Sequence, residues 1–449
     1  MRKFFLLNLI CLALTSCSLL NSSMGIGTGE SVTTSSNSKS TKDKWTILIY
    51  MAADNNLESE AIEDIWEMET SKLNCKNTNI LFLLDRSPSY DISNGNWSGT
   101  KMFSLKTGRS NNSRTMISTE INCEELGLVA GKENELDLSD TYVLANAVSF
   151  MMNNFKSNHY GLIMWGHGTG WRGSEDKIEK NKGFAFDSTS GTYMSLQQMK
   201  NGIKSGLQDK KLDFIGFDTC FGGEVEVFYE LKDLALYGIG SPGLLVSSGW
   251  NYTTLLNDFT AKSQKGVLDF CDSAVYQFQK EYAHKNGASI TVVDLSKTQE
   301  YFENFENFME LATECVDSPI TRDEIINDIF TNCLTYTEGT TGSDVYIDIN
   351  SLVEMTGNHL DLIDEKNDFL IRSNEFVVKG WANDTEKPGP GIYFASIAES
   401  GLFAAKHPSG YIKGASSEQI DFVRDSKWYV PCKEKRGSFI DKLFYTTNW

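Results

Sequence analysis

The sequence has no surplus of positive charge, no long hydrophobic run and no paired cysteine motif. Its formal net charge is −19 over 449 residues, which argues against a protein that binds nucleic-acid phosphates. The 40% apolar composition is that of a soluble globular protein and excludes a membrane protein with many spans. The nine cysteines include no CxxC pair, so no zinc framework is predicted. GxSxG and HExxH are also absent, which removes support for an α/β-hydrolase or a zincin.

The first residues form a targeting pattern. Arg2 and Lys3 precede the apolar run Phe4–Leu14, which is too short to span a bilayer alone, and Leu14-Thr15-Ser16-Cys17 follows. This predicts a signal peptide over 1–16. The last four residues resemble the lipobox of bacterial lipoproteins, which implies lipidation of Cys17 and a lipid anchor in the cell envelope, at the outer membrane or the cell surface. Plain secretion and an uncleaved anchor are the alternatives.

The stretch that follows, residues 17–43, is rich in Ser, Thr, Asn and Gly. Such a composition cannot bury enough apolar surface to fold, so it predicts a flexible tether. Without Cys11 and Cys17, seven cysteines remain. Seven is odd, so at least one thiol stays unpaired if all pairing is internal.

From residue 44 onward, short apolar runs alternate with amphipathic patterns. This alternation predicts a parallel sheet covered by helices on both faces, as one doubly wound α/β domain over 44–300. Residues 301–449 are expected to form a mixed α/β accessory region or a continuation of the sheet. The predicted strands are 45–52, 79–84, 160–165, 212–217, 236–240 and 289–293, with 344–349 and 391–394 later. The first predicted helix begins near Leu57. Further helices are predicted over 141–154 (capped by Asp140), 196–207, 224–231, 267–283 and 296–314.

Two of these strands end in residues that can do chemistry. The third strand ends in WGHGTG, with His167, and the fourth ends in FDTCFGG, with Cys220. In a parallel sheet, ligands bind beyond the carboxyl ends of the strands, so on neighbouring strands the two side chains could face each other. An imidazole beside a thiol is the minimum for nucleophilic catalysis. Taken singly, each residue is more often a turn histidine or a buried small hydrophobe.

The glycines around these residues let the backbone turn and expose amide groups. The amides of Gly168 and Cys220 could form an oxyanion hole, and Gly222 and Gly223 could expose further amides.

The strings WGHGTGW and FDTCFGGEVEVFYEL resemble the clostripain-like cysteine peptidases of the caspase–gingipain–legumain clan. WTILIYMAADNNLE, GFAFD, GWNY, SITVVDL and GIYF resemble further parts of that family, so the resemblance covers nearly all of 44–430. It implies a caspase-like three-layer sandwich with a mostly parallel central sheet. It also implies a cysteine endopeptidase with His167 as general acid/base and Cys220 as nucleophile, a peptide or protein as substrate, and no third triad residue.

The same resemblance bears on specificity and activation. Asp218 matches a residue beside the S1 pocket of relatives, although a turn or capping carboxylate is an equal alternative. Relatives that cut after Arg or Lys usually carry an acid where this chain has Ser248, so a P1 guanidinium would lack its partner. Cleavage in 171–182 is a possible activation step, at Lys177, Lys180 or Lys182, with an ordinary surface loop as the alternative. Some relatives need calcium, but no DxDxDG loop is visible, so no metal or cofactor is expected.

Other interpretations are weaker. Gly168–Gly173 fits GxGxxG, but SEDKIEKNK gives no apolar helix after it, so a dinucleotide site is disfavoured. No Arg lies six residues after Cys220, which excludes the usual Cys phosphatase. A surface lipoprotein that uses a peptidase fold only for binding remains the main alternative. A monomer is expected, with membrane contact only through Cys17 and no nucleic-acid partner.

Overall fold

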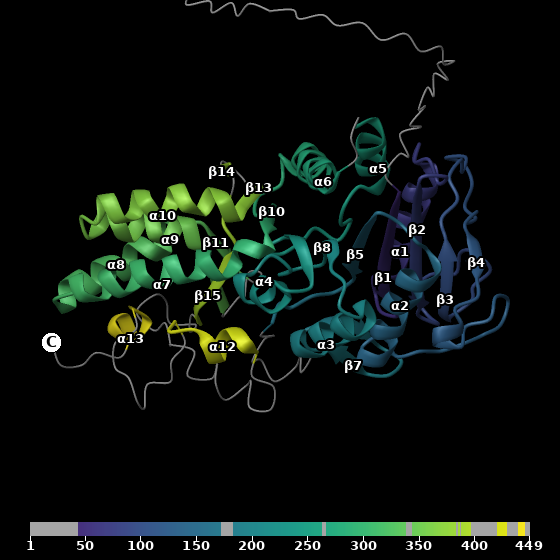
Figure 1. Cartoon of the computed structure of the whole chain (residues 1–449), viewed down its shortest axis with the longest axis horizontal. Helices are drawn as coiled ribbons and strands as arrows, with labels where there is room; N and C mark the ends of the chain where they lie inside the picture. The colour runs from purple at the N-terminus through teal and green to yellow at the C-terminus, as the bar shows by residue number, and fades with distance from the viewer. Residues whose placement is uncertain are drawn as a thin grey trace, which may run out of the picture. The chain divides into compact units, whose positions relative to one another are not determined.

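A ten-stranded sheet runs through the part of the chain that the computed structural model describes, in the strand order β14-β13-β10-β9-β8-β5-β1-β2-β3-β4 (Figure 1). The described residues are 44–171, 183–262, 266–337, 344–382, 385–386, 388–396, 420–428 and 439–444. They belong to one unit, Lys42–Trp449. Among these residues, no helix combines the length and the apolar character needed to cross a membrane.

Five neighbouring strands at the centre of the sheet are parallel. They are β2 (Thr78–Arg86), β1 (Trp45–Ala53), β5 (His159–Trp165), β8 (Leu212–Asp218) and β9 (Ala235–Gly240). Their residues are almost all buried, because both faces of the sheet are covered. This is the mostly parallel α/β architecture that the sequence predicted.

Antiparallel strands extend this centre on both sides. On one side lie β3 (Gly99–Ser104) and β4 (Thr119–Ile121), and on the other β10 (Ser289–Asp294), β13 (Val377–Ala382) and β14 (Thr385–Glu386). Residues beyond 300 therefore contribute strands to the main sheet. Two small sheets are separate, one of β11 (Thr335–Thr337), β12 (Asp344–Asp348) and β15 (Gly391–Ser396), the other of β6 (Phe184–Asp187) and β7 (Thr192–Met194).

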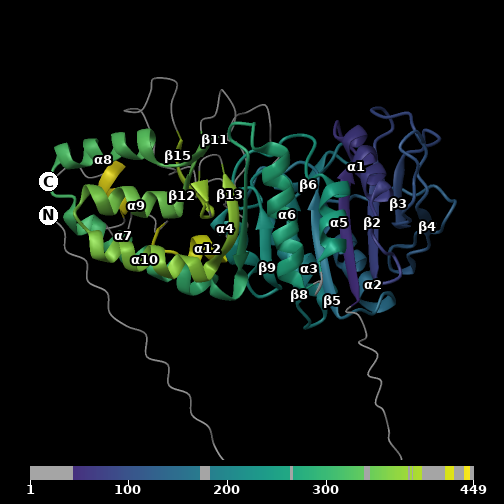
Figure 2. The ribbon, with the colours of Figure 1, turned by 90° about the horizontal axis from the view of Figure 1, so that it is seen from above.

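Helices cover both faces, as the alternation along β1 requires. Leu48 and Tyr50 belong to one apolar core, while Ile47 and Ile49 belong to the other. The first core includes α2 (Thr141–Asn154), α3 (Leu196–Leu207), α4 (Val225–Leu231) and α7 (Thr298–Cys315). The second includes α1 (Glu58–Thr70), α5 (Tyr252–Ala261) and α6 (Val267–Tyr282), which Figure 2 shows side by side over the strands.

The predicted bounds of α2 and α3 are confirmed to the residue because both helices have side-chain caps. Asp140 accepts a hydrogen bond from the Tyr142 amide, and Ser195 forms a capping box with Gln198. The remaining helices and turns are η1 (Glu124–Leu126), η2 (Leu295–Lys297), α8 (Pro319–Asn332), α9 (Ile349–His359), α10 (Ile363–Phe376), α12 (Asp421–Asp425) and α13 (Phe439–Phe444). α7 to α10 pack together beyond the β13 side of the sheet (Figure 1).

Candidate active site

The two predicted catalytic loops leave adjacent parallel strands at the same level. β5 pairs with β8, and Trp165 is opposite Asp218 in the register. His167 and Cys220 each follow two residues later. The Gly166 amide donates to the Asp218 carbonyl at 3.3 Å, which ties the start of one loop to the end of the other strand.

The His167 loop lies directly against the Cys220 loop. A side chain at Gly168 would place its Cβ 2.5 Å from the carbonyl oxygen of Cys220 and 2.9 Å from the Cβ of Thr219. Only glycine fits so close to another backbone. The glycine at 168 is therefore what allows the two loops to meet.

The imidazole of His167 is held from the loop after β1. Its Nε2 lies 2.8 Å from the Asn56 side-chain oxygen, and the Phe186 ring packs edge-on at a centroid distance of 6.0 Å. With an amide oxygen as acceptor, Nε2 donates the proton. This leaves Nδ1 as the ring nitrogen that can take a proton from a nucleophile.

The thiol of Cys220 is half-buried and has a backbone donor. The Leu245 amide lies 3.2 Å from Sγ. A hydrogen bond to the charged form of an acid favours that form, so this amide stabilises a thiolate. Asn56 and Leu245 were both missed in the sequence, although the string Asp54-Asn55-Asn56 stood out at the end of the first strand.

The role of Gly223 differs from the predicted one. Its amide donates to the Ser241 carbonyl at 2.8 Å and is not exposed. A Cβ at this position would lie 2.6 Å from the Pro242 nitrogen. This glycine serves close backbone packing behind the nucleophile loop.

Asp218 is buried and contacts the turn that follows β9. Its carboxylate accepts hydrogen bonds from the Trp250 amide at 3.1 Å and from the Tyr252 hydroxyl at 2.8 Å. Burial raises the pKa of Asp218 to about 7, against the lowering effect of these two donors. The same turn carries Ser248, which is exposed, with its Oγ 2.9 Å from the Tyr282 hydroxyl. The structure thus brings Asp218 and Ser248 to one turn, with Gly249 packed on the carboxylate.

Comparison with known proteins identifies the family. The model of the clostripain family of peptidases matches residues 49–428. The chain belongs to the clostripain family. Clostripain of Hathewaya histolytica is 28% identical over 208 residues, which cover 44% of this chain and 38% of that protein. The family consists of cysteine-type peptidases, in agreement with the resemblance seen in the sequence.

Two solved structures share the fold. A secreted C11 cysteine protease from Bacteroides thetaiotaomicron, in complex with an irreversible peptide inhibitor, has a TM-score of 0.57 and 19% identity. The similarity covers 86% of this chain and 99% of that one. An inactive zymogen C11 protease from Parabacteroides distasonis has a TM-score of 0.58 and 19% identity, over 86% of this chain and 98% of that one. The predicted caspase-like fold class of this clostripain-family chain is confirmed.

Several predicted sites of this clostripain-family chain lie outside the described residues. These are the lipidation site Cys17 and the possible processing sites Lys177, Lys180 and Lys182. No disulfide joins the cysteines of the described part, which are Cys75, Cys123, Cys220, Cys271, Cys315 and Cys333. Burial raises the pKa of Cys123 and Cys333 to about 12, so these two thiols are inert at neutral pH.

Proposed function

We propose that this chain is a cysteine endopeptidase in which Cys220 is the nucleophile and His167 the general acid/base. The observation that carries the proposal is the meeting of the two loops, with Gly168 against the Cys220 carbonyl at the ends of register-paired strands. Family membership supports it independently.

The reaction runs through a thioester. His167 takes the proton of the Cys220 thiol, and the thiolate attacks the carbonyl carbon of the substrate peptide bond. The C–N bond then breaks while His167 gives its proton to the leaving amine. Water, deprotonated by His167, attacks the thioester, which releases the acid and restores the thiol. The Asn56 oxygen keeps the imidazole oriented. The Leu245 amide lowers the free energy of the thiolate form of Cys220.

The tetrahedral intermediates need donors for their oxyanion. We assign the backbone amides of Gly168 and Cys220 to this role, because both lie where the two loops meet. Each such donor typically contributes about 3–4 kcal/mol to transition-state stabilisation.

The P1 residue would meet the turn that carries Ser248. Asp218 is 3% exposed and its oxygens already accept bonds from that turn, so it offers a P1 cation little free charge. Ser248 offers a hydroxyl in place of a carboxylate. We therefore propose that this S1 site does not strongly prefer Arg or Lys at P1. It also accepts polar or smaller residues.

Export and anchoring follow from the N-terminal sequence. The proposal includes cleavage behind Ser16, lipidation of Cys17, and a monomeric peptidase tethered to the cell envelope through residues 17–43. Its substrates are peptides or proteins. The net charge of −19 disfavours nucleic acid as a partner.

A peptide-library digest with the purified protein tests the assignment and gives the P1 profile. The wild type and Cys315→Ala, a control at an exposed thiol, are expected to cleave. Cys220→Ala is expected to fold normally and not to cleave. Wild-type turnover by Cys220→Ala would overturn the nucleophile. No cleavage by any of the three, before and after limited proteolysis within 171–182, would favour a binding module with a peptidase fold.

A further inference from the structure

We propose that Asp54, Asp85, Glu135 and Asp187 form a binding site for one calcium ion. One carboxylate oxygen from each of these residues can be chosen so that all four lie within 4.8 Å of one another. Asp54 follows β1, Asp85 lies in β2, Glu135 precedes α2, and Asp187 ends β6. Four separate segments of the chain therefore converge on one point, which is why the sequence shows no continuous calcium loop.

Two of the converging oxygens have no hydrogen-bond donor. Asp54 and Asp85 are each 1% exposed, and in the described part of the chain nothing donates to Asp54 Oδ1 or Asp85 Oδ2. The second oxygen of each is held in place: the Thr189 amide donates to Asp54 Oδ2 at 2.7 Å, and the Thr100 hydroxyl donates to Asp85 Oδ1 at 2.8 Å. A buried carboxylate oxygen without a donor is costly unless a cation binds it.

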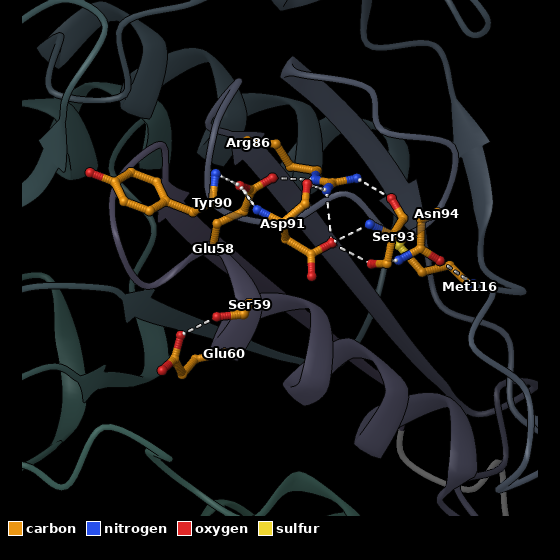
Figure 3. A network of polar contacts seen from close by, with 9 residues as sticks. All are labelled: Glu58, Ser59, Glu60, Arg86, Tyr90, Asp91, Ser93, Asn94 and Met116. Atoms are coloured by element: carbon orange, nitrogen blue, oxygen red, sulfur yellow. Dashed lines mark hydrogen bonds and ion pairs between the residues drawn. The ribbon is translucent and has the colours of Figure 1, made fainter.

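Within the described residues, the negative charge of this cluster is not balanced by an ion pair. Throughout the residues that the structure describes, no Lys, Arg or His forms an ion pair with any of the four carboxylates. Arg86 is the neighbour of Asp85 in β2, but its side chain pairs with carboxylates outside the cluster. Its guanidinium pairs with Glu58 at 2.7 Å and with Asp91 at 3.1 Å (Figure 3).

The four carboxylates repel one another, because one oxygen of each lies within 4.8 Å of the others. A divalent ion would remove this repulsion, because it favours the charged form of all its ligands.

The ligand chemistry selects the ion. All four donors are carboxylate oxygens, which suit a hard cation, whereas zinc prefers nitrogen and sulfur. Magnesium usually keeps several waters and uses only one or two carboxylates, while calcium takes about six to eight oxygens. Four convergent carboxylates therefore favour calcium.

The site adjoins the two segments that hold His167. Asp54 lies two residues before Asn56, which bonds the imidazole, and Asp187 follows Phe186, whose ring packs on it. Asn55 already ties these segments together, because its side-chain amide donates to the Phe186 carbonyl at 3.0 Å. A bound ion would join them more firmly and so position His167, a consequence that rests on the proposed function.

Isothermal titration of calcium chloride into the metal-free protein tests the site. The wild type is expected to bind about one equivalent. Asp85→Asn and Glu135→Gln are expected to weaken binding roughly tenfold or more. Asp140→Asn, a nearby exposed carboxylate outside the cluster, is expected to bind within about twofold of wild type. Calcium should also raise the melting temperature of the wild type but not of Asp85→Asn.

The outcomes separate this site from the peptidase proposal. Cys220→Ala is expected to bind calcium as the wild type does, so a failure of the nucleophile assignment would leave the site intact. No binding heat and no rise in melting temperature for the wild type would overturn the site. Wild-type affinity in Glu135→Gln, whose exposed side chain can change without loss of folding, would overturn it equally. Magnesium that binds as tightly as calcium would overturn the choice of ion.

Discussion

Trp165 and Asp218 are opposite each other in the register of β5 and β8, and each precedes a proposed catalytic residue by two positions. Both side chains form hydrogen bonds with helices on the same face of the sheet. The Trp165 indole donates to Asp64 at 2.7 Å, and Asp218 accepts from the Tyr252 hydroxyl at 2.8 Å. A slip of one residue between these strands would turn one of the two side chains to the other face. The pairing therefore sets the relative height of the two catalytic loops.

Asn56 is expected to matter for turnover although it would not touch substrate. Asn56→Ala removes the acceptor of the His167 Nε2 proton at 2.8 Å. A hydrogen bond of about 1–1.5 kcal/mol corresponds to roughly a tenfold loss of kcat. The measurement is the pH profile of kcat, which should shift as well as fall, since the imidazole loses its tautomer-setting partner. Asn153→Ala, on the exposed side of α2, is the control, and an equal effect in both variants would contradict the positioning role.

Ser248 is expected to control the P1 profile. Ser248→Asp adds a carboxylate to the exposed turn next to Gly249, so cleavage after Arg should rise relative to other residues. Ser247→Asp adds the same charge one residue away and is the matched control. The P1-scanning library gives the comparison directly. An unchanged profile in Ser248→Asp, or the same change in both variants, would refute the assignment of Ser248 to the S1 site.

Asp218 is expected to make the fold less stable as pH rises. Its pKa is raised from 3.8 to about 7 in the folded state, so between these values the folded state holds a proton that the unfolded state has lost. Stability is therefore highest near the lower value and declines as pH approaches 7. Urea midpoints measured across this range should fall less steeply for Asp218→Asn. Some slope should remain, because burial also raises the pKa of Glu67 and Asp348 to about 7.

The control for this titration is Asp140→Asn, which changes an exposed carboxylate at the start of α2. Its pH dependence should follow that of the wild type. If Asp218→Asn showed the same slope as both, the raised pKa of Asp218 would not contribute to the stability of the fold.

Arg86 is expected to be essential for the stability of the β2 end. Its side chain and that of Glu58 are both 0% exposed, and the guanidinium also donates to the Asp91 and Ser93 carbonyls (Figure 3). Arg86→Met leaves Glu58 buried without its cation, which should cost about 3–5 kcal/mol of unfolding free energy. Urea denaturation measures this loss. Arg372→Met breaks an exposed pair with Asp368 and should cost at most about 1 kcal/mol; similar losses in the two variants would contradict this account.

The sequence predicted best what depends on local periodicity. The buried parallel strands and the capped helices α2 and α3 were predicted within a residue or two, because their apolar spacing and caps lie within one segment. Helix α5 was missed, since Gly249 and Trp250 indicated only a turn, although Asn251 caps the helix through the Thr254 amide. The antiparallel strands β3, β4 and β13 were missed as well, because their pairing depends on partners far along the chain.

The same distinction applies to the candidate site. His167 and Cys220 stood out because each follows an apolar strand. Asn56 lies 111 residues from the histidine that it bonds, and Leu245 lies 25 residues from Cys220, so neither contact left a pattern in the sequence. The four carboxylates of the proposed calcium site are similarly scattered, and only the fold brings them together.

The place of β1 in the sheet has a consequence for how the chain folds. β1 is the first strand of the described chain, yet it lies between β2 and β5, and Trp45 pairs with both Thr78 and His159. The second pairing closes a loop of more than a hundred residues, which carries a larger entropic cost than a hairpin does. The centre of the sheet therefore cannot be completed until the segment near residue 165 is available. Such non-local pairing is typical of slow folding, so the nascent N-terminal strand would spend much of that time without one of its partners.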